Sequence, residues 1–120
     1  MKRCILLADD DLDQLSIREM LFQQLGYEVL TATGCEAALE QVRGKCPECA
    51  VIDLRLPDEQ TGLRLIRELK KLAAGMRIFV LTGARKELLD GKPEGELVAG
   101  VFRKGEPLRL LLREVQRSVA

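Results

Sequence analysis

Short, unbroken apolar runs recur along the chain and predict buried strands. The clearest runs are at 4–8 (CILLA), 49–54 (CAVIDL) and 77–83 (RIFVLTG), and weaker ones stand at 27–32 and 97–104. A strand that is buried on both faces has a continuous apolar run instead of alternating apolar and polar residues. The pattern therefore predicts five strands in a sheet that is covered on both sides.

Between these runs, apolar residues recur at the spacing of an α-helix. The predicted helices are 13–26, 34–44, 62–75, 84–97 and 107–119. In the first of them the apolar residues at helical spacing are Leu15, Ile17, Met20, Leu21 and Leu25. The third is the clearest, because Leu63, Ile66 and Leu69 share one face. The fourth contains Gly91, Pro93 and Gly95, so we expect it to be short or frayed.

Alternating strands and helices with short connections predict right-handed crossovers onto a parallel sheet. The predicted fold is a three-layer, doubly wound α/β unit. A chain of 120 residues fits one such unit, so a single domain is expected over 1–120.

Charge and composition restrict the function. The 19 basic and 19 acidic residues balance, so this domain alone is expected to bind neither nucleic acid nor an anionic membrane. No run approaches a membrane-spanning length, and we expect a soluble, cytoplasmic protein. The chain has no histidine, which excludes a Ser-His-Asp triad, a histidine metal ligand and a phosphohistidine on this chain.

The four cysteines include a C-x-x-C pair, Cys46 and Cys49. A zinc site needs two further ligands, and Cys4 and Cys35 form no matching second pair. A redox motif of this type should open a helix, whereas this one runs into the apolar segment AVID. We expect all four to be ordinary packing residues.

Polar residues stand where the predicted strands end. Asp9 and Asp10 follow the first strand, Asp53 the third, Thr82 the fourth and Lys104 the fifth. Ligands of doubly wound sheets bind at the carboxyl ends of the strands, so we expect these side chains to converge. Asp11 or Asp13 is expected to cap the following helix instead.

Convergence of three carboxylates is costly without a cation. Two ionised carboxylates about 4 Å apart repel by on the order of 4 kcal/mol at an effective dielectric constant near 20. Hard oxygen ligands suit Mg²⁺, which together with Lys104 offsets the three negative charges. Because the empty site carries this repulsion, removing Asp9 or Asp10 is expected to leave the metal-free stability unchanged or higher. A carboxylate can also accept a phosphoryl group, with the hydroxyl of Thr82 and the ammonium of Lys104 holding its oxygens.

These residues resemble the receiver domains of bacterial two-component response regulators. The resemblance covers essentially the whole chain and rests on four segments in order: LLADDD, VIDLRLP, VLTG and VFRKG. It implies a flavodoxin-like strand order 2-1-3-4-5 and transfer of a phosphoryl group from a histidine kinase or histidine phosphotransfer protein. Such a domain is a phosphoacceptor with possible autodephosphorylation, not a turnover enzyme.

The resemblance also implies a role for each residue. Asp53 is the phosphoacceptor, while Asp9 and Asp10 hold Mg²⁺ directly or through water. The backbone carbonyl of Arg55 is a further metal ligand. Thr82 and Lys104 contact the phosphoryl group.

Some residues depart from the family pattern. The lysine is followed by Gly105 instead of proline, so we expect a trans peptide bond there. The family's switch aromatic, three residues before the lysine, is Val101, and Phe102 is one place off. The loop LPDEQTG is about one residue longer than usual. The usual signalling face therefore looks altered.

Two alternatives remain open. A pseudo-receiver would bind proteins without being phosphorylated, and the altered switch residues favour it. A haloacid-dehalogenase-type phosphatase also uses an N-terminal D-x-D, but it would leave Asp53 without a role. The kinase, the output, homodimerisation and whether the domain stands alone are not specified by the sequence.

Overall fold

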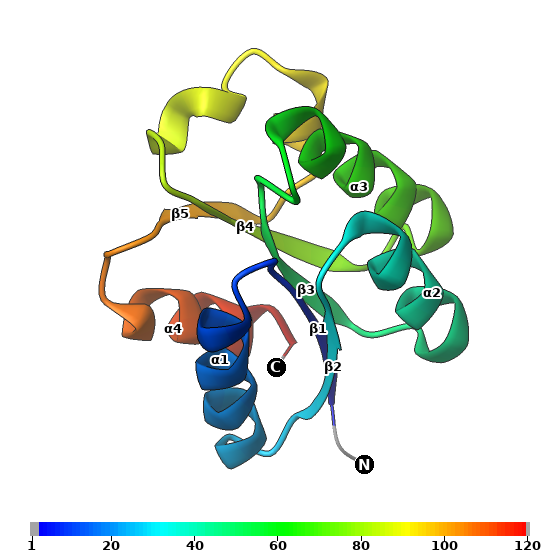
Figure 1. Ribbon diagram of the computed structural model, residues 1–120, viewed down its shortest axis with the longest axis vertical. Helices are drawn as coiled ribbons and strands as arrows, with labels where there is room; N and C mark the ends of the chain where they lie inside the picture. The colour runs from blue at the N-terminus through cyan, green and yellow to red at the C-terminus, as the bar shows by residue number, and fades with distance from the viewer. Residues whose placement is uncertain (1–2, 120) are drawn as a thin grey trace.

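The five apolar runs form one parallel five-stranded sheet. The computed structural model describes residues 3–119 (Figure 1). The strands are β1 (Cys4–Ala8), β2 (Glu28–Ala32), β3 (Cys49–Asp53), β4 (Arg77–Thr82) and β5 (Gly100–Arg103). Their order across the sheet is β2-β1-β3-β4-β5. The predicted doubly wound topology and strand order are confirmed.

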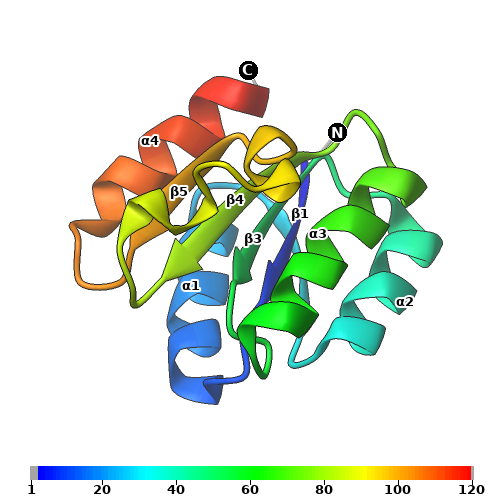
Figure 2. The same ribbon diagram turned by 90° about the horizontal axis from the view of Figure 1, so that it is seen from above.

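Helices cover both faces of the sheet (Figure 2). The α-helices are α1 (Leu12–Gln24), α2 (Cys35–Lys45), α3 (Glu59–Leu72) and α4 (Leu108–Val119). In Figure 2, α1 and α4 lie on one side of the sheet, and α2 and α3 lie on the other. This three-layer arrangement is the one that the pattern predicted.

The fourth predicted helix, 84–97, is not an α-helix. The chain forms two short 3₁₀ helices there, η1 (Lys86–Leu89) and η2 (Pro93–Glu96), which cover the β4–β5 end of the sheet (Figure 1). Gly91 lies between them with φ +79°, a conformation that ends a helix, and Pro93 lacks an N–H. The segment 84–97 was expected to be a short or frayed helix; it forms no α-helix but two 3₁₀ helices, and the expected disruption by glycine and proline is present.

The core has two halves, one on each face of the sheet. On the α2–α3 side, Leu63, Ile66 and Leu69 of α3 are buried, as predicted. On the α1–α4 side, Phe22 and Tyr27 meet edge to face with ring centroids 5.4 Å apart. Because both faces are packed, every residue of β3 is buried, and the strand projects its last residue to the edge where the other strands end.

Helix α1 packs differently from its apolar pattern. Ile17, Met20 and Leu25, expected at helical spacing, are exposed. The buried residues of α1 are Leu15, Arg18 and Phe22. Thus an arginine occupies the stripe that faces the sheet.

Helices α1 and α3 each begin at an aspartate whose side chain caps the helix. Asp11 caps α1, its carboxylate accepting hydrogen bonds from the N–H groups of Asp13 and Gln14, so the choice of Asp11 or Asp13 falls to Asp11. Asp58 caps α3 in the same way. Gly62 lets α3 approach the end of β3, since a Cβ at this position would lie 1.7 Å from the carbonyl oxygen of Leu54.

The cysteines are unpaired and mostly serve packing. Cys35 and Cys49 are buried, Cys4 is half-buried and Cys46 is exposed. Burial raises the pKa of Cys49 to about 12, so its thiol stays protonated at neutral pH. The expectation that all four are packing residues fails for Cys46, which ends α2 in a left-handed conformation.

Two smaller expectations concern the backbone and the membrane. Among residues 3–119 the cis bond is Leu56–Pro57, so the bond between Lys104 and Gly105 is trans, as expected. No helix in this described range has the length and apolar character needed to cross a membrane.

Candidate functional site

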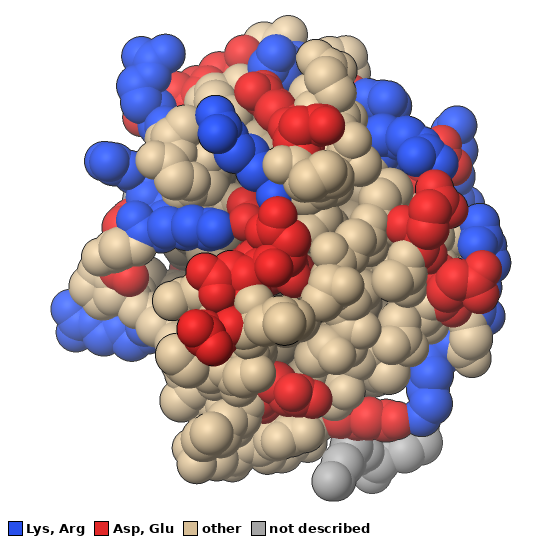
Figure 3. Space-filling view, in the orientation of Figure 1, with Lys and Arg blue, Asp and Glu red and all other residues tan. Residues whose placement is uncertain are grey.

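Acidic side chains gather at the carboxyl ends of the strands. Figure 3 shows them as one patch above α1, with basic side chains beside it. The patch arises because parallel strands end at the same edge, where β1 runs into Asp9 and β3 ends at Asp53. Thr82 ends β4, and Lys104 follows β5. The convergence predicted from the sequence is therefore present.

Asp53 lies at the centre of the group and is almost fully buried, with 4% of its surface exposed. Its Oδ2 accepts a hydrogen bond from Nζ of Lys104 at 2.8 Å. Its Oδ1 accepts one from the backbone N–H of Arg55 at 3.1 Å. Each carboxylate oxygen thus has a donor, and one of the two donors is a cation.

Burial raises the pKa of the Asp53 carboxyl above its ordinary value. The ammonium of Lys104 and the N–H of Arg55 act in the opposite direction, and the nearby Asp9 carboxylate adds to the rise. Burial is the largest of these effects. Lys104 therefore does much to keep a buried carboxylate ionised.

Asp9 has no exposed surface and is paired with an arginine. Oδ2 of Asp9 lies 2.6 Å from Nη1 of Arg18, and Oδ1 accepts a hydrogen bond from the N–H of Asp11 at 2.9 Å. Arg18 itself is 7% exposed. A cation of the protein itself thus balances this carboxylate.

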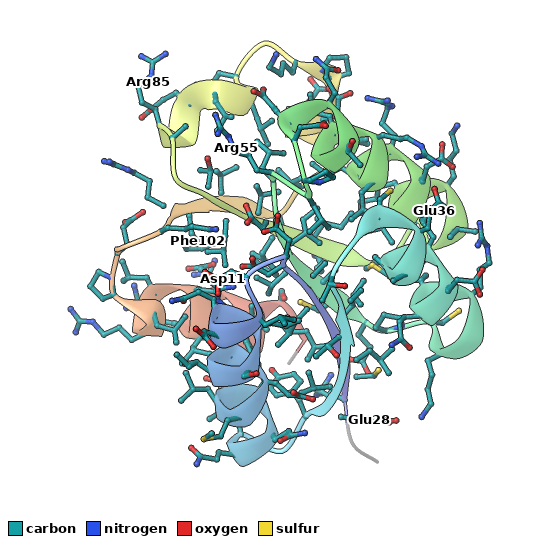
Figure 4. All side chains as sticks on the ribbon, in the orientation of Figure 1. Asp11, Glu28, Glu36, Arg55, Arg85 and Phe102 are labelled. Atoms are coloured by element: carbon teal, nitrogen blue, oxygen red, sulfur yellow. The ribbon has the colours of Figure 1, made fainter. Side chains whose placement is uncertain are left out.

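An open pocket of about 480 Å³ lies above these groups. Its lining residues are Asp10, Asp53, Arg55, Pro57, Gly83, Ala84 and Lys104. Asp10 is exposed toward this pocket, whereas Asp9 lies buried beneath it. In Figure 4, Arg55 lies toward η1 and Asp11 at the start of α1, on opposite sides of the strand ends.

The donor set fits a hard divalent cation. One carboxylate oxygen from each of Asp9, Asp10 and Asp53 lies within 4.8 Å of the others. All three ligands are oxygens, and the pocket above them has room for water or a phosphoryl group. The residues therefore suit Mg²⁺ better than a soft metal.

Thr82 lies beside the pocket without lining it. The residue is 4% exposed, and its Oγ1 accepts a hydrogen bond from the N–H of Ala84 at 3.0 Å. This bond holds the turn into Gly83 and Ala84, which do line the pocket. Thr82 is thus placed to affect the pocket through the loop that follows it.

Val101 and Phe102 point to opposite faces of β5. Val101 packs with the core on the α2–α3 side. Phe102 packs with the core on the α1–α4 side, where its ring centroid is 6.2 Å from that of Phe79. The aromatic residue therefore lies on the face away from η1, and Val101 lies outside the pocket lining.

Sequence analysis missed Arg18. The signal for it was spacing: Arg18 lies three residues after Leu15 and four before Phe22, so it belongs to their buried stripe. A lone arginine on such a stripe needs a buried acid as its partner. Asp9, at the end of the adjacent strand, was the available one.

Comparison with protein families identifies a match over most of the chain. Residues 5–93 match the model of the response regulator receiver domain. The transcriptional regulatory protein ZraR of Escherichia coli O157:H7 is 32% identical over 78 residues, which is 65% of this chain. The match spans 18% of the length of ZraR.

Solved structures share the fold over almost the whole chain. A response regulator protein from Burkholderia pseudomallei, solved with a phosphorylated aspartic acid and a calcium ion, has a TM-score of 0.81 and 24% identity, covering 99% of this chain and 74% of that one. The response regulator TrrA from Thermotoga maritima, in complex with Mg²⁺ and beryllofluoride, has a TM-score of 0.84 and 22% identity, covering 97% of this chain and 98% of that one.

Proposed function

Because this chain belongs to the response regulator receiver domain family, we propose that it accepts a phosphoryl group on Asp53 with Mg²⁺ as cofactor. The observation that carries the proposal is the contact of 2.8 Å between Lys104 Nζ and Asp53 Oδ2, with Asp9 and Asp10 oxygens within 4.8 Å. A nucleophile, a cation and an acidic metal pocket thus meet at one point. This combination is what phosphoryl transfer to a carboxylate needs.

In this proposal a carboxylate oxygen of Asp53 attacks the phosphorus of the donor. A P–O bond to Asp53 forms as the bond from phosphorus to the leaving group breaks, and the leaving group keeps the electron pair. Lys104 then transfers its hydrogen bond from the carboxylate to a phosphoryl oxygen. The mobility that this requires fits its side chain, which is 36% exposed while that of Asp53 is 5% exposed.

Asp9, Asp10 and Asp53 would hold Mg²⁺, together with the backbone carbonyl of Arg55. When bound, Mg²⁺ neutralises phosphoryl oxygens and fixes their position. The N–H of Arg55 holds Oδ1 of Asp53 in place for the reaction. Thr82 would contact the phosphoryl group once its hydroxyl leaves the N–H of Ala84.

The proposed donor is a histidine kinase or a histidine phosphotransfer protein in the cytoplasm. Residues 1–120 contain no histidine, so a phosphohistidine donor lies outside this domain. Autodephosphorylation by water would make the signal transient without making the domain a turnover enzyme. Family membership gives no support to the haloacid-dehalogenase alternative.

A second candidate is a pseudo-receiver that binds a partner without phosphorylation. Two observations favour it: the 3₁₀ segment in place of an α-helix between β4 and β5, and the engagement of Asp9 by Arg18. Both change parts of the domain that bind the cofactor or transmit the signal.

Labelling with acetyl phosphate and Mg²⁺ separates the two candidates. We expect one phosphoryl group per chain by intact mass, and none in Asp53→Asn. Asp58→Asn is the matched control, because Asp58 is an exposed helix cap outside the pocket. Labelling that persists in Asp53→Asn would reject Asp53 as acceptor, and no labelling of the wild-type chain would favour the pseudo-receiver.

A further inference from the structure

Arg18 is a buried cation with one dominant partner. Its side chain is 9% exposed and that of Asp9 is 1% exposed, and Nη1 of Arg18 lies 2.6 Å from Oδ2 of Asp9. Its Nη2 makes only a long contact, 3.5 Å, with the side-chain oxygen of Gln14. Arg18 therefore depends on Asp9 for its charge balance.

Both carboxylate oxygens of Asp9 already accept a hydrogen bond before any metal binds. The N–H of Asp11 donates to Oδ1 and Arg18 donates to Oδ2. Since its two oxygens already have strong donors, Asp9 offers a metal less negative charge than Asp10, which is exposed to the pocket. The three acids of the cluster are thus unequal.

We propose that Arg18 is a built-in counter-ion that lowers the affinity of the acidic pocket for its divalent cation. The inference rests on the proposed function, which assigns a metal to Asp9, Asp10 and Asp53. Two cations, Arg18 and Lys104, are in contact with carboxylates of the three-acid cluster. The three acids and these two paired cations together carry a net charge near −1, not the −2 that Lys104 alone would leave.

The physical basis is competition between cations for one carboxylate. A guanidinium that contacts a ligand carboxylate repels a divalent cation on the same group, and burial reduces the screening of that repulsion. Arg18 also holds the Asp9 carboxylate in place, which favours metal binding by organising the ligand. The proposal states that repulsion is the larger effect, so removal of the charge strengthens metal binding.

The test is a calorimetric titration of the metal-free, unphosphorylated chain with MgCl₂ at pH 8 and low salt. We expect Arg18→Met to bind Mg²⁺ roughly tenfold more tightly than the wild type. Arg18→Gln should also bind more tightly, because it keeps a donor for Asp9 without the charge, and it serves if Arg18→Met does not fold. Arg18→Lys keeps the charge and should stay within about twofold of the wild type.

The control is Arg67→Met. Arg67 is also paired with a nearly buried acid, with Nη1 2.5 Å from Oε2 of Glu94, but it lies outside the pocket lining. Its removal should leave the Mg²⁺ affinity unchanged. If Arg18 had only a structural role, its replacement would lower the unfolding midpoint without changing the Mg²⁺ affinity.

The outcomes distinguish this inference from the proposed function. If wild type, Arg18→Gln and Arg18→Met bind Mg²⁺ with equal affinity, or the variants bind it more weakly, the counter-ion role is overturned and the metal site stands. If Arg18→Lys binds as tightly as Arg18→Gln, charge is not the cause, and the inference fails. If none of the chains binds Mg²⁺, both the inference and the proposed cofactor fail.

Discussion

The ammonium of Lys104 and the carboxylate of Asp53 are joined by a contact of 2.8 Å, although 51 positions separate the two residues in the chain. The acid is buried and the lysine is more exposed. The contact therefore connects the end of β3 to the loop after β5 through a partly exposed side chain. Burial raises the pKa of the Asp53 carboxyl, and the contact with Lys104 is the largest of the effects that lower it.

We predict that Lys104→Met lowers both stability and phosphorylation. The free energy of unfolding should fall by about 1 kcal/mol, because the buried Asp53 loses its cationic donor while solvent still reaches the pocket. Labelling by acetyl phosphate should slow by at least tenfold. Urea unfolding and intact mass measure the two effects. Lys71→Met, which changes an exposed lysine of α3, is the control; equal behaviour of the two variants would contradict the prediction.

We predict that Asp9 and Asp10 differ in the metal-free protein. Asp10→Asn should leave the free energy of unfolding unchanged or raise it by up to about 1 kcal/mol, because repulsion is relieved. Asp9→Asn should lower it by about 3 kcal/mol, because Arg18 becomes a buried charge without a partner. This revises the expectation from the sequence, which treated the two acids alike. Urea unfolding in EDTA measures both, and a stable Asp9→Asn would contradict the importance of the pair.

We predict that Gly62→Ala destabilises the fold by about 3 kcal/mol or more. The added Cβ would lie 1.7 Å from the carbonyl oxygen of Leu54, so α3 must move away from the end of β3. Gly44→Ala is the matched control, since nothing lies within 4 Å of its added Cβ in α2. That change should stabilise the protein by up to about 1 kcal/mol. Thermal unfolding compares them, and similar midpoints would reject the steric account.

We predict that a phosphoryl mimic acts mainly on residues 83–96. Val101 is too short to repeat an aromatic swing, whereas Thr82 is bonded to Ala84 at the start of this segment. The far end of the segment is held to α3 by the ion pair of Arg67 with Glu94. Amide hydrogen exchange with and without beryllofluoride measures the response. Changes confined to β5 and α4, with 83–96 unaffected, would contradict the prediction.

The strands of the sheet could be predicted from the sequence, because a strand that is buried on both faces has a continuous apolar run. Cys4–Ala8 is both the first apolar run and the first strand, and Asp53 ends β3 as the run at 49–54 indicated. The segment 84–97 was predicted less fully: its glycines and proline indicated that the helix is disrupted, but not the two 3₁₀ helices that contact α3 and β5. Gly95 is an example: its added Cβ would lie 2.5 Å from the carbonyl oxygen of Leu89, a tight turn that periodicity does not reveal.

The acids and the lysine of the candidate site could be predicted from the sequence. The arginine that balances one of these acids was missed. Asp9, Asp53 and Lys104 could be found because strand ends converge in this topology. Arg18 could not be found in the same way, because it comes from a helix whose apolar residues Ile17 and Met20 suggested a different buried face. Its spacing from Leu15 and Phe22 was the sign that it is buried, and the contact with Asp9 shows its partner.

The short sequence interval between Asp9 and Arg18 has a consequence for how the protein is made. The two residues lie nine positions apart, Asp9 directly after β1 and Arg18 in α1, so this pair can close as soon as these two elements are made. Asp53 and Lys104 are 51 positions apart, so their contact forms only once β4 and β5 have also been made. During synthesis Asp9 therefore meets its cation before Asp53 does, and the acid that is buried most deeply is neutralised first.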